Sequence, residues 1–287
     1  MYYLGFDVGG SSVKAVLVKE RKIIKSIIEN LPTDLVGLLV LVEKVIGELT
    51  AGLAQNEIKG IGFGLAGALD AEREKTLNSP NISYLNNQPI KRLLTEKLAP
   101  WPIKIEHDVH CFLLAETKFG LAQNLKNVFY LTLGTGIGGA LLINGRIFAG
   151  AHGAAGEVGH MVIDLSNQLD WEELTANKFV KKMIGVSGDE AEKLARSGDQ
   201  KAKELFDERG RNLGIGIANI INIFDPEAII IGGGMVSARE FILEGAQKGI
   251  ETYVISPAAK QTKILFSELG RMGGAWGAAL LFDPAPF

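Results

Sequence analysis

The sequence predicts a two-domain α/β protein whose halves share one plan and face a central cleft. Its 287 residues exceed the roughly 100–200 that one domain usually takes. Segments with the strand period alternate with segments with the helix period. FDVGGSSVKAVLVKERKI and LGTGIGGALLINGRI both read as strand, glycine turn, strand, polar turn and strand. This internal echo is what two similar halves would produce.

The first half is expected to begin with strands around a glycine turn and to continue with alternating helices and strands. The helix that starts at Leu35 has apolar residues on one face through Leu49, and Pro32 and Thr33 precede it as start signals. Gly120 fits a helix C-cap. The expected strands cover 2–6, 13–18, 22–28, 58–65 and 103–106, and the expected helices 35–49, 90–98 and 108–119.

The second half is expected to repeat the strand plan and then to become helical. Asn144-Gly145 between apolar runs is a hairpin signal. A helical stretch over about 171–223 has breaks near Gly185 and Gly198 and is closed by Pro226. The remaining expected elements are strands over 127–133, 140–143 and 228–231 and a last helix over 276–281.

Composition favours a soluble cytoplasmic protein. With 30 Lys and Arg against 33 Asp and Glu, the net charge of −3 lacks the basic footprint of nucleic-acid binding. Cys111 is the only cysteine, which excludes an intramolecular disulfide and a Cys-rich zinc site. The start MYYLGFDVGG does not read as a signal peptide, and no apolar run reaches the ~18 residues of a membrane span. We expect neither nucleic-acid nor membrane partners.

The 35 glycines are clustered, and the first cluster is a candidate phosphate cradle. It begins at Asp7 and ends at Lys14. Gly9 and Gly10 let backbone N–H groups face an anion, and Ser11 adds a hydroxyl donor. Asp7 suits a magnesium ion, bound directly or through water. The alternative is a tight β-turn in which Asp7 bonds only to its own backbone.

Two further glycine clusters follow expected strands. Residues 134–139, with Gly134, Thr135 and Gly136, match G-x-G-x-x-G, and so do residues 62–67, which end at Gly67. A dinucleotide fingerprint needs a helix directly after the glycines, whereas a strand follows residue 139, so we reject that interpretation. The third cluster ends a strand, where nucleotides commonly bind, and consists of Gly232, Gly233 and Gly234.

IEHDVHC places Asp108 between a strand and a helix. An aspartate there suits a helix N-cap or a general base. His107, His110 and Cys111 have the spacing of metal ligands, but no fourth ligand is indicated. In GAAGEVGH, glycines disfavour a regular helix, so a loop presenting Glu157 and His160 to a polyol is favoured over an ordinary exposed turn.

Seven segments together resemble the ROK family of bacterial sugar kinases and repressors, within the actin-like ATPase superfamily. They occur in the family's order: DVGGSSVK (7–14), IGFGLAGALD (61–70), EHDVHCFLLAE (106–116), LGTGIGGALLINGRI (133–147), GAAGEVGH (153–160), NIINIFDPEAIIIGGG (219–234) and GGAWGAALL (273–281). The resemblance implies a two-domain actin-like ATPase (ribonuclease H-like) fold with ATP and sugar in its interdomain cleft. We expect a small domain over 1–118, a large domain over 119–275, and a C-terminal helix, 276–287, that packs back on the small domain.

The resemblance also implies an activity and its residues. The activity is ATP-dependent phosphorylation of a hydroxyl, O6, of glucose, another hexose or an N-acetylhexosamine, with Asp108 as general base. The implied sugar ligands are His107, Glu157, His160, Glu172, Asn81 and Gly67. The implied nucleotide ligands are Asp7, Gly9, Gly10, Ser11, Lys14, Gly134, Thr135, Gly136, Gly232, Gly233 and Gly234. Magnesium near Asp7 and a homodimer are implied as well.

Three departures from the family pattern bear on function. MVIDLSNQLDWEELT, after the Gly-His pair, lacks the family's Cys-rich motif, so we expect no structural zinc. Some polyphosphate-using glucokinases lack this motif too, so polyphosphate is an alternative donor. His107 stands where the family usually carries Asn, so the identity of the sugar substrate is not fixed and glucose cannot be assumed. In the loop over residues 61–70, Ala66 replaces the Pro that is usual in the family, which would make this loop less rigid.

Other functions are less consistent with these residues. Repressors of the family carry a helix-turn-helix ahead of the Asp-Gly-Gly loop, whereas six residues precede Asp7, so we expect a kinase. A non-catalytic sugar sensor is opposed by the presence of Asp7, Asp108 and the glycine loops. A filament-forming ATPase is opposed by the Gly-Glu-Val-Gly-His segment, which has no role there.

Overall fold

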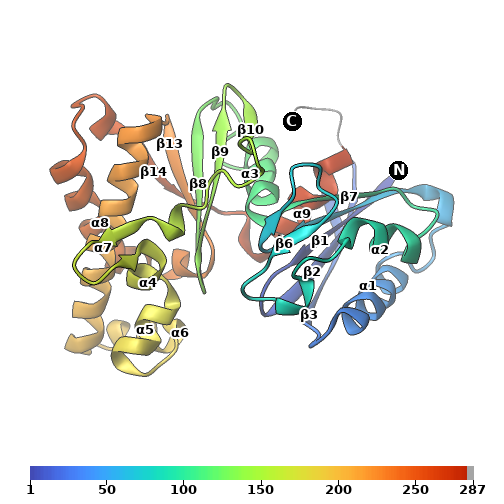
Figure 1. Ribbon diagram of the computed structural model, residues 1–287, viewed down its shortest axis with the longest axis horizontal. Helices are drawn as coiled ribbons and strands as arrows, with labels where there is room; N and C mark the ends of the chain where they lie inside the picture. Colours follow the sequence, from blue (N-terminus) through green and yellow to red (C-terminus); the bar gives the residue numbers. More distant parts are fainter. Residues whose placement is uncertain (283–287) are drawn as a thin grey trace. The chain divides into compact units, whose positions relative to one another are not determined.

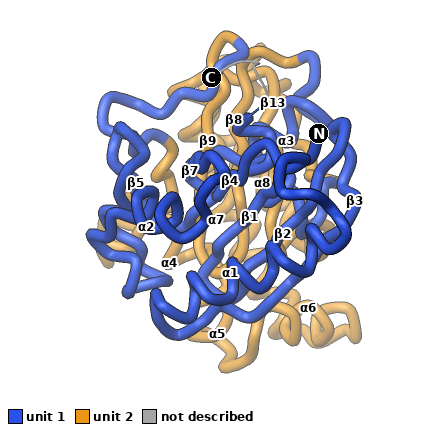
Figure 2. The backbone as a smooth tube through the Cα atoms, turned by 90° about the vertical axis from the view of Figure 1, so that its right-hand side faces the viewer, with its two compact units in different colours: residues 1–124, 145–155, 269–287 blue, residues 125–144, 156–268 orange. Residues whose placement is uncertain are grey.

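The computed structural model describes residues 1–282, and the chain forms two compact units (Figures 1 and 2). Unit 1 consists of Met1–Asn124, Gly145–Ala155 and the segment from Leu269 onward. Unit 2 consists of Leu125–Asn144 and Gly156–Glu268. The chain therefore passes from unit 1 to unit 2 and back twice.

Unit 1 is organised around a mixed five-stranded sheet with the order β3-β2-β1-β4-β7. Its strands are β1 (Tyr2–Val8), β2 (Ser12–Lys19), β3 (Lys22–Asn30), β4 (Ile58–Leu65) and β7 (Ile103–His107). The first three strands are antiparallel, whereas β1, β4 and β7 are parallel. Asp7 lies opposite Gly64, and Gly64 opposite Glu106. The carboxyl ends of the three parallel strands therefore meet at one edge. A short hairpin, β5 (Ala68–Leu69) and β6 (Thr76–Asn78), follows β4.

Helices cover both faces of this sheet. They are α1 (Leu35–Leu49), α2 (Ile90–Lys97), α3 (Asp108–Phe119) and α9 (Gly273–Ala279). The apolar face of α1 packs in one core with Leu4, Phe6 and Val8 of β1. The helix starts at Leu35 as expected, but its cap is Asp34, whose carboxylate accepts the Gly37 N–H at 2.7 Å.

The other face of the sheet carries α9. A Cβ atom on Gly5 or Gly62 would collide with a carbonyl oxygen of this helix. Only glycine at these two strand positions lets the backbone of α9 approach the sheet so closely. The helix begins at Gly273 rather than the expected Trp276, and it gives way to a 3-10 turn (Leu280–Phe282) after Ala279. Residues 283–287 of the expected C-terminal helix lie outside the described residues.

Unit 2 repeats the strand plan, which confirms the internal echo. The second sheet has the order β10-β9-β8-β13-β14, with β8, β13 and β14 parallel. Its strands in unit 2 are β8 (Val128–Leu133), β9 (Ile137–Ile143), β13 (Ala228–Gly232) and β14 (Lys263–Phe266). The edge strand β10 (Arg146–Phe148) comes from the Gly145–Ala155 segment, which is assigned to unit 1. Asn144 and Gly145, which lead from β9 into β10, both have positive φ, as a type I′ turn requires.

The helical region of unit 2 is more divided than the sequence indicates. Its helices are α4 (Trp171–Thr175), α5 (Asn177–Ile184), α6 (Gly188–Arg196), α7 (Gln200–Phe224) and α8 (Arg239–Tyr253). The expected breaks occur at Gly185 and Gly198, both with positive φ, and a further break falls at Ala176. A small hairpin, β11 (Val162–Asp164) and β12 (Leu169–Asp170), precedes α4. Across residues 1–282, no helix has the length and apolar character needed to cross a membrane.

Candidate active site

Asp7 lies near the carboxyl end of β1, paired with a lysine on the neighbouring strand. Its side chain is buried, and Oδ2 is 2.8 Å from Nζ of Lys14, the residue directly opposite on β2. Burial raises the pKa of Asp7, and the positive charge of Lys14 acts against that rise. A single carboxylate of this kind suits Mg²⁺, which proteins commonly hold through one or two carboxylates, water and phosphates.

The first glycine turn lies beside two of the expected sugar-site residues. The Gly9 N–H donates to the Ser12 carbonyl at 3.1 Å. A Cβ on Gly10 would lie 2.7 Å from Cβ of Asn81, so these two residues are neighbours. The N–H of Ala66, just before Gly67, donates to the Val8 carbonyl at 3.1 Å. Unit 1 therefore brings the turn, Asn81 and the loop at Gly67 to the end of β1.

Asp108 is the first residue of α3, and the N-cap is His107 in extended conformation. The alternative role of Asp108 as N-cap is therefore wrong. Its Oδ1 accepts the Val109 N–H at 2.8 Å and lies 3.2 Å from Nδ1 of His107. Asp108 remains 22% exposed, and a Cβ on Gly64 would lie 3.3 Å from its Cα. The carboxylate thus stands at the sheet edge within reach of a ligand.

A buried carboxylate that sequence reasoning missed lies directly before this pair. Oε1 of Glu106 accepts from Nε of Arg73 and from the His107 N–H, each at 2.8 Å, and lies 3.0 Å from Nδ1 of His110. Burial raises the pKa of Glu106, but the bond and charge of His110, with Arg73 and the His107 N–H, hold it below its ordinary value. The only sequence signal was the spacing of Glu106 and His110 by four residues.

His107 is held as a neutral imidazole near pH 7. Burial lowers its pKa to about 4, helped by the positive charges of His110 and Arg73 and opposed by Glu106. The Cys111 thiol is buried, which raises its pKa well above the ordinary value. Within the described part of the chain, no three His, Cys, Asp or Glu side chains gather in a way that could hold a metal ion.

In unit 2, the second and third glycine clusters leave neighbouring parallel strands. Gly232 lies opposite Thr132, so β8 and β13 end at the same edge. Gly233 has φ of 90°, and a Cβ there would collide with the Leu133 carbonyl. A Cβ atom at Gly134 or Gly234 would meet no atom within 4 Å, so both glycines border open space. Thr135 is exposed.

Glu172 holds the second glycine loop. Its Oε2 accepts the Ile137 N–H at 2.8 Å, and Oε1 is 2.7 Å from Nζ of Lys178. The Asn177 N–H donates to the Gly134 carbonyl at 2.9 Å. The start of the helical region is thus tied to both sides of the loop.

Glu157 is the N-cap and His160 the last residue of a 3-10 turn, Val158–His160, and the segment forms no regular helix, as the glycines indicated. The turn packs on β9, because a Cβ on Gly159 would collide with the Ile137 carbonyl. Nδ1 of His160 lies 3.1 Å from Oδ2 of Asp170. This bond raises the pKa of His160, and the charges of Glu172, Asp170 and Glu157 add to the rise. Unit 2 therefore groups Glu157, His160 and Glu172 with the second glycine loop.

A buried arginine of unit 2 was also missed. Arg209 donates to the Thr175 carbonyl at 3.0 Å, to Oδ1 of Asn177 at 3.2 Å and to Sδ of Met235 at 2.7 Å. It therefore joins the helical region to the turn after Gly234. Burial lowers its pKa to about 10. No pattern in the sequence marks this residue.

Comparisons with known proteins place the chain in a family. The ROK family model matches residues 3–284. The chain belongs to the ROK family. It is 31% identical to the N-acetyl-D-glucosamine kinase of Vibrio vulnificus, over 98% of this chain and 99% of that protein. It is 27% identical to the glucokinase of Streptomyces coelicolor, over 99% of this chain and 98% of that protein.

Solved structures of the ROK family share this fold. The crystal structure of a ROK family glucokinase from Streptomyces griseus in complex with glucose and AMPPNP superimposes with a TM-score of 0.87 and 26% identity, over 98% of this chain and 99% of that one. This confirms the expected actin-like ATPase fold with two mixed sheets. The chain is thus a full-length homologue of sugar kinases.

Proposed function

We propose that this ROK family protein is a sugar kinase that transfers the γ-phosphoryl group of ATP to O6 of a hexose or N-acetylhexosamine. One observation carries the proposal. Asp108 stands, partly exposed, at the sheet edge where β1, β4 and β7 end, at the position the family resemblance gives the general base. The full-length likeness to a glucokinase and an N-acetyl-D-glucosamine kinase supports it.

In the proposed reaction, the Asp108 carboxylate accepts the proton of the sugar hydroxyl while its oxygen attacks the γ-phosphorus. The bond from that phosphorus to the β–γ bridging oxygen breaks, and ADP leaves. Such transfers depend mostly on positioning and charge neutralisation. Mg²⁺ held at Asp7, directly or through water, would neutralise phosphate charge. The nucleotide ligands are the three glycine clusters together with Ser11, Lys14 and Thr135.

The proposed sugar ligands are Asn81, Gly67 and His107 in unit 1, and Glu157, His160 and Glu172 in unit 2. A neutral His107 both donates and accepts a hydrogen bond, as an asparagine does, but with a different reach. Because Nδ1 of His160 is engaged by Asp170, Nε2 is the ring nitrogen for a sugar hydroxyl. The relatives named above make glucose and N-acetylglucosamine the first substrates to test.

ATP is the proposed donor, because a homologous glucokinase was crystallised with AMPPNP. Polyphosphate is the second candidate, since the family's Cys-rich motif is missing after His160. The homodimer, the cytoplasmic location and the domain division at 118/119 and 275/276 stay predictions.

The test is ADP release from Mg-ATP with a panel of hexoses and N-acetylhexosamines. Turnover with one sugar, lost in Asp108→Asn, is the expected result. If no sugar supports ADP release, the panel is repeated with polyphosphate. If neither donor supports turnover but calorimetry shows sugar binding, the proposed kinase activity is refuted and a non-catalytic sugar sensor becomes the preferred function.

A further inference from the structure

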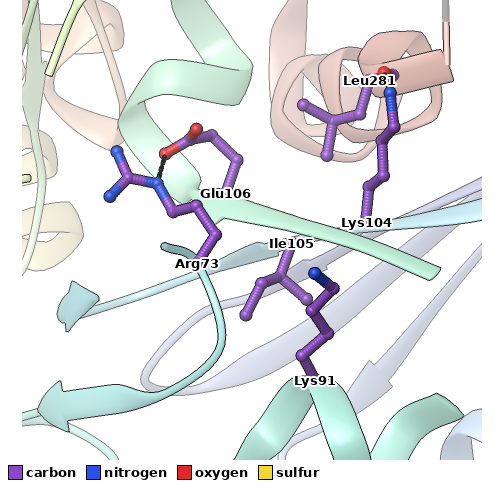
Figure 3. Close-up of a pocket in the computed structure, with 6 residues that line it drawn as sticks. All are labelled: Arg73, Lys91, Lys104, Ile105, Glu106 and Leu281. Atoms are coloured by element: carbon purple, nitrogen blue, oxygen red, sulfur yellow. Dashed lines mark hydrogen bonds and ion pairs between the residues drawn. The ribbon is translucent and has the colours of Figure 1, made fainter. Parts of the chain in front are cut away.

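Arg73 and Glu106 connect two segments of unit 1 that both carry proposed sugar-site residues. Arg73 lies in the turn between β5 and β6, in the segment from Gly67 to Asn81. Glu106 lies in β7, directly before His107 and Asp108. Their bond, Nε to Oε1 at 2.8 Å, joins residues 33 positions apart (Figure 3). The bond therefore ties the β5–β6 turn to the residue two positions before the start of α3.

Arg73 has an unusual backbone conformation and a fixed side chain. Its backbone has φ of 59°, in the left-handed region that residues other than glycine rarely adopt. Its Nη1 donates to the Asp70 carbonyl at 2.9 Å, which fixes the guanidinium beside its own turn. A strained backbone persists where surrounding contacts demand it, and such sites are often functional. Here the guanidinium is held by its bonds to Asp70 and Glu106.

Arg73 and His110 are the two side chains whose positive charge and bonds stabilise the Glu106 carboxylate. The two residues line a pocket of about 210 Å³ together with two lysines (Figure 3). Lys91 is paired instead with Glu74, at 2.5 Å, and Lys104 donates to the Leu281 carbonyl at 2.7 Å. A carboxylate that is 8% exposed needs a compensating charge and bonds, and removing one partner of a buried pair is costly.

The three groups bound to Oε1 of Glu106 show what Arg73 controls. One is the backbone N–H of His107, which belongs to the cap of α3. Another is Nδ1 of His110, one turn into the helix. The third is Arg73 itself, which stabilises the charge and orientation of the carboxylate. Displacing the carboxylate removes the acceptor of the backbone N–H of the residue next to Asp108.

We propose that Arg73 is a positioning residue for phosphoryl transfer, acting through Glu106 on the backbone of His107, the ring of His110 and thereby the place of Asp108. The inference rests on the proposed function. Small misplacements of reacting groups cost about 10²-fold in rate. Arg73→Ala should therefore lower kcat about 10- to 100-fold, while the KM values for sugar and ATP change less than about threefold.

Chemical rescue tests this role. Since Arg73 lines a pocket open to solvent, Arg73→Ala leaves space that guanidinium, at a concentration that leaves the melting curve unchanged, can occupy beside Glu106. Guanidinium should restore part of the lost kcat, and Arg73→Lys should retain more activity than Arg73→Ala. Lys91→Ala is the matched control, because it removes a cation from the same pocket without touching Glu106. It should keep the wild-type kcat and show no response to guanidinium.

A second readout is independent of activity. The chain has four histidines, so each ring can be followed by NMR. The groups facing Glu106 are Arg73, His107 and His110, with Lys91 and Lys104 on the pocket wall. Without the positive charge of Arg73 the pKa of Glu106 rises, so the acid titration of Glu106, read from the shifts of the neighbouring histidine rings, should move to higher pH. Lys91→Ala should leave it in place.

The outcomes separate this inference from the proposed function. With an active wild type, unchanged kcat and unchanged histidine spectra in Arg73→Ala would refute the positioning role alone. A loss of kcat that guanidinium does not restore, with unchanged spectra, would also refute it. An inactive wild type would refute the proposed function and the catalytic part of the inference together. If Arg73→Ala does not fold, Arg73→Gln must show the same loss and the same spectral change.

Discussion

Replacing Asp108 by asparagine separates the catalytic role of this carboxylate from its structural role. The amide has nearly the same shape, and its oxygen can still accept the Val109 N–H that Oδ1 accepts at 2.8 Å. What is lost is the negative charge at the first residue of α3 and the ability to take a proton. The first loss affects stability, and the second affects turnover.

The two losses differ enough in size to be told apart. A negative charge in the first turn of a helix contributes about 0.3–1 kcal/mol through the helix dipole. For a chain of this size, that lowers Tm by at most about 2–4 °C. Removal of a general base costs about 10²–10⁴-fold in kcat, or about 3–5 kcal/mol in the activation free energy. A destabilisation of at most about 1 kcal/mol leaves nearly all molecules folded at 25 °C.

The assay is ADP release under saturating sugar and Mg-ATP, with a melting curve of each protein and calorimetry of sugar binding. We expect Asp108→Asn to bind sugar with little change, to melt within a few degrees of the wild type, and to lose at least about 10² in kcat. Turnover within tenfold of the wild type would refute Asp108 as the base. A large fall in Tm would show that the carboxylate is chiefly structural.

Three further predictions concern stability. Gly62→Ala should destabilise unit 1 by about 1–3 kcal/mol, because the new methyl group collides with a carbonyl oxygen of α9; urea unfolding measures this. Lys14→Met should cost about 3–5 kcal/mol by leaving Asp7 buried without its partner, and Asp7→Asn in the same chain should recover part of it. Stability should fall as pH drops from 6.5 to about 4, because over this range the unfolded chain protonates His107 and the folded chain does not. The loss is up to about 3 kcal/mol, and His107→Gln should remove it.

Each of these predictions has its own control. Gly47→Ala places a methyl group in α1 where no atom lies within 4 Å, and it should stabilise by about 0.5–1 kcal/mol. Equal stability of Gly62→Ala and wild type would contradict the close approach of α9. A double variant at Lys14 and Asp7 less stable than Lys14→Met alone would show that the pair does not explain the loss. The same acid dependence in His107→Gln and wild type would assign it to other groups.

The strand plan could be predicted because its signals are local. Alternating apolar residues and the glycine turns define β1–β2 and β8–β9 without reference to the rest of the chain. The start of α9 could not, because Gly273 and Gly274 are poor helix formers. That helix is fixed by packing on Gly5 and Gly62, which lie more than two hundred residues earlier in the chain.

The candidate site also has features that local sequence predicts and features that it does not. The motif identified Asp108 as the residue between strand and helix, but the extended backbone of His107 decides that the cap falls one residue earlier. The bond between Arg73 and Glu106 depends on where the β5–β6 turn falls beside β7, which no local pattern encodes. Arg209 was missed for the same reason, since its three partners come from distant segments.

The packing of α9 on the glycine strands has a consequence for biosynthesis. A ribosome makes β1 and β4 early, but it reaches Gly273 only roughly 150 residues after the first segment of unit 1 ends at Asn124. At about 5–20 residues per second, the nascent chain waits about 7–30 s for this helix. During this time Val16 and Val18 lack the contacts with Ala275 and Ala279 that bury them in the finished protein. Unit 2 is complete at Glu268, so it can fold first, and the sheet made earliest is the last to be finished. Ribosome-bound chains stalled before and after α9 should therefore differ in protease resistance in unit 1 and not in unit 2.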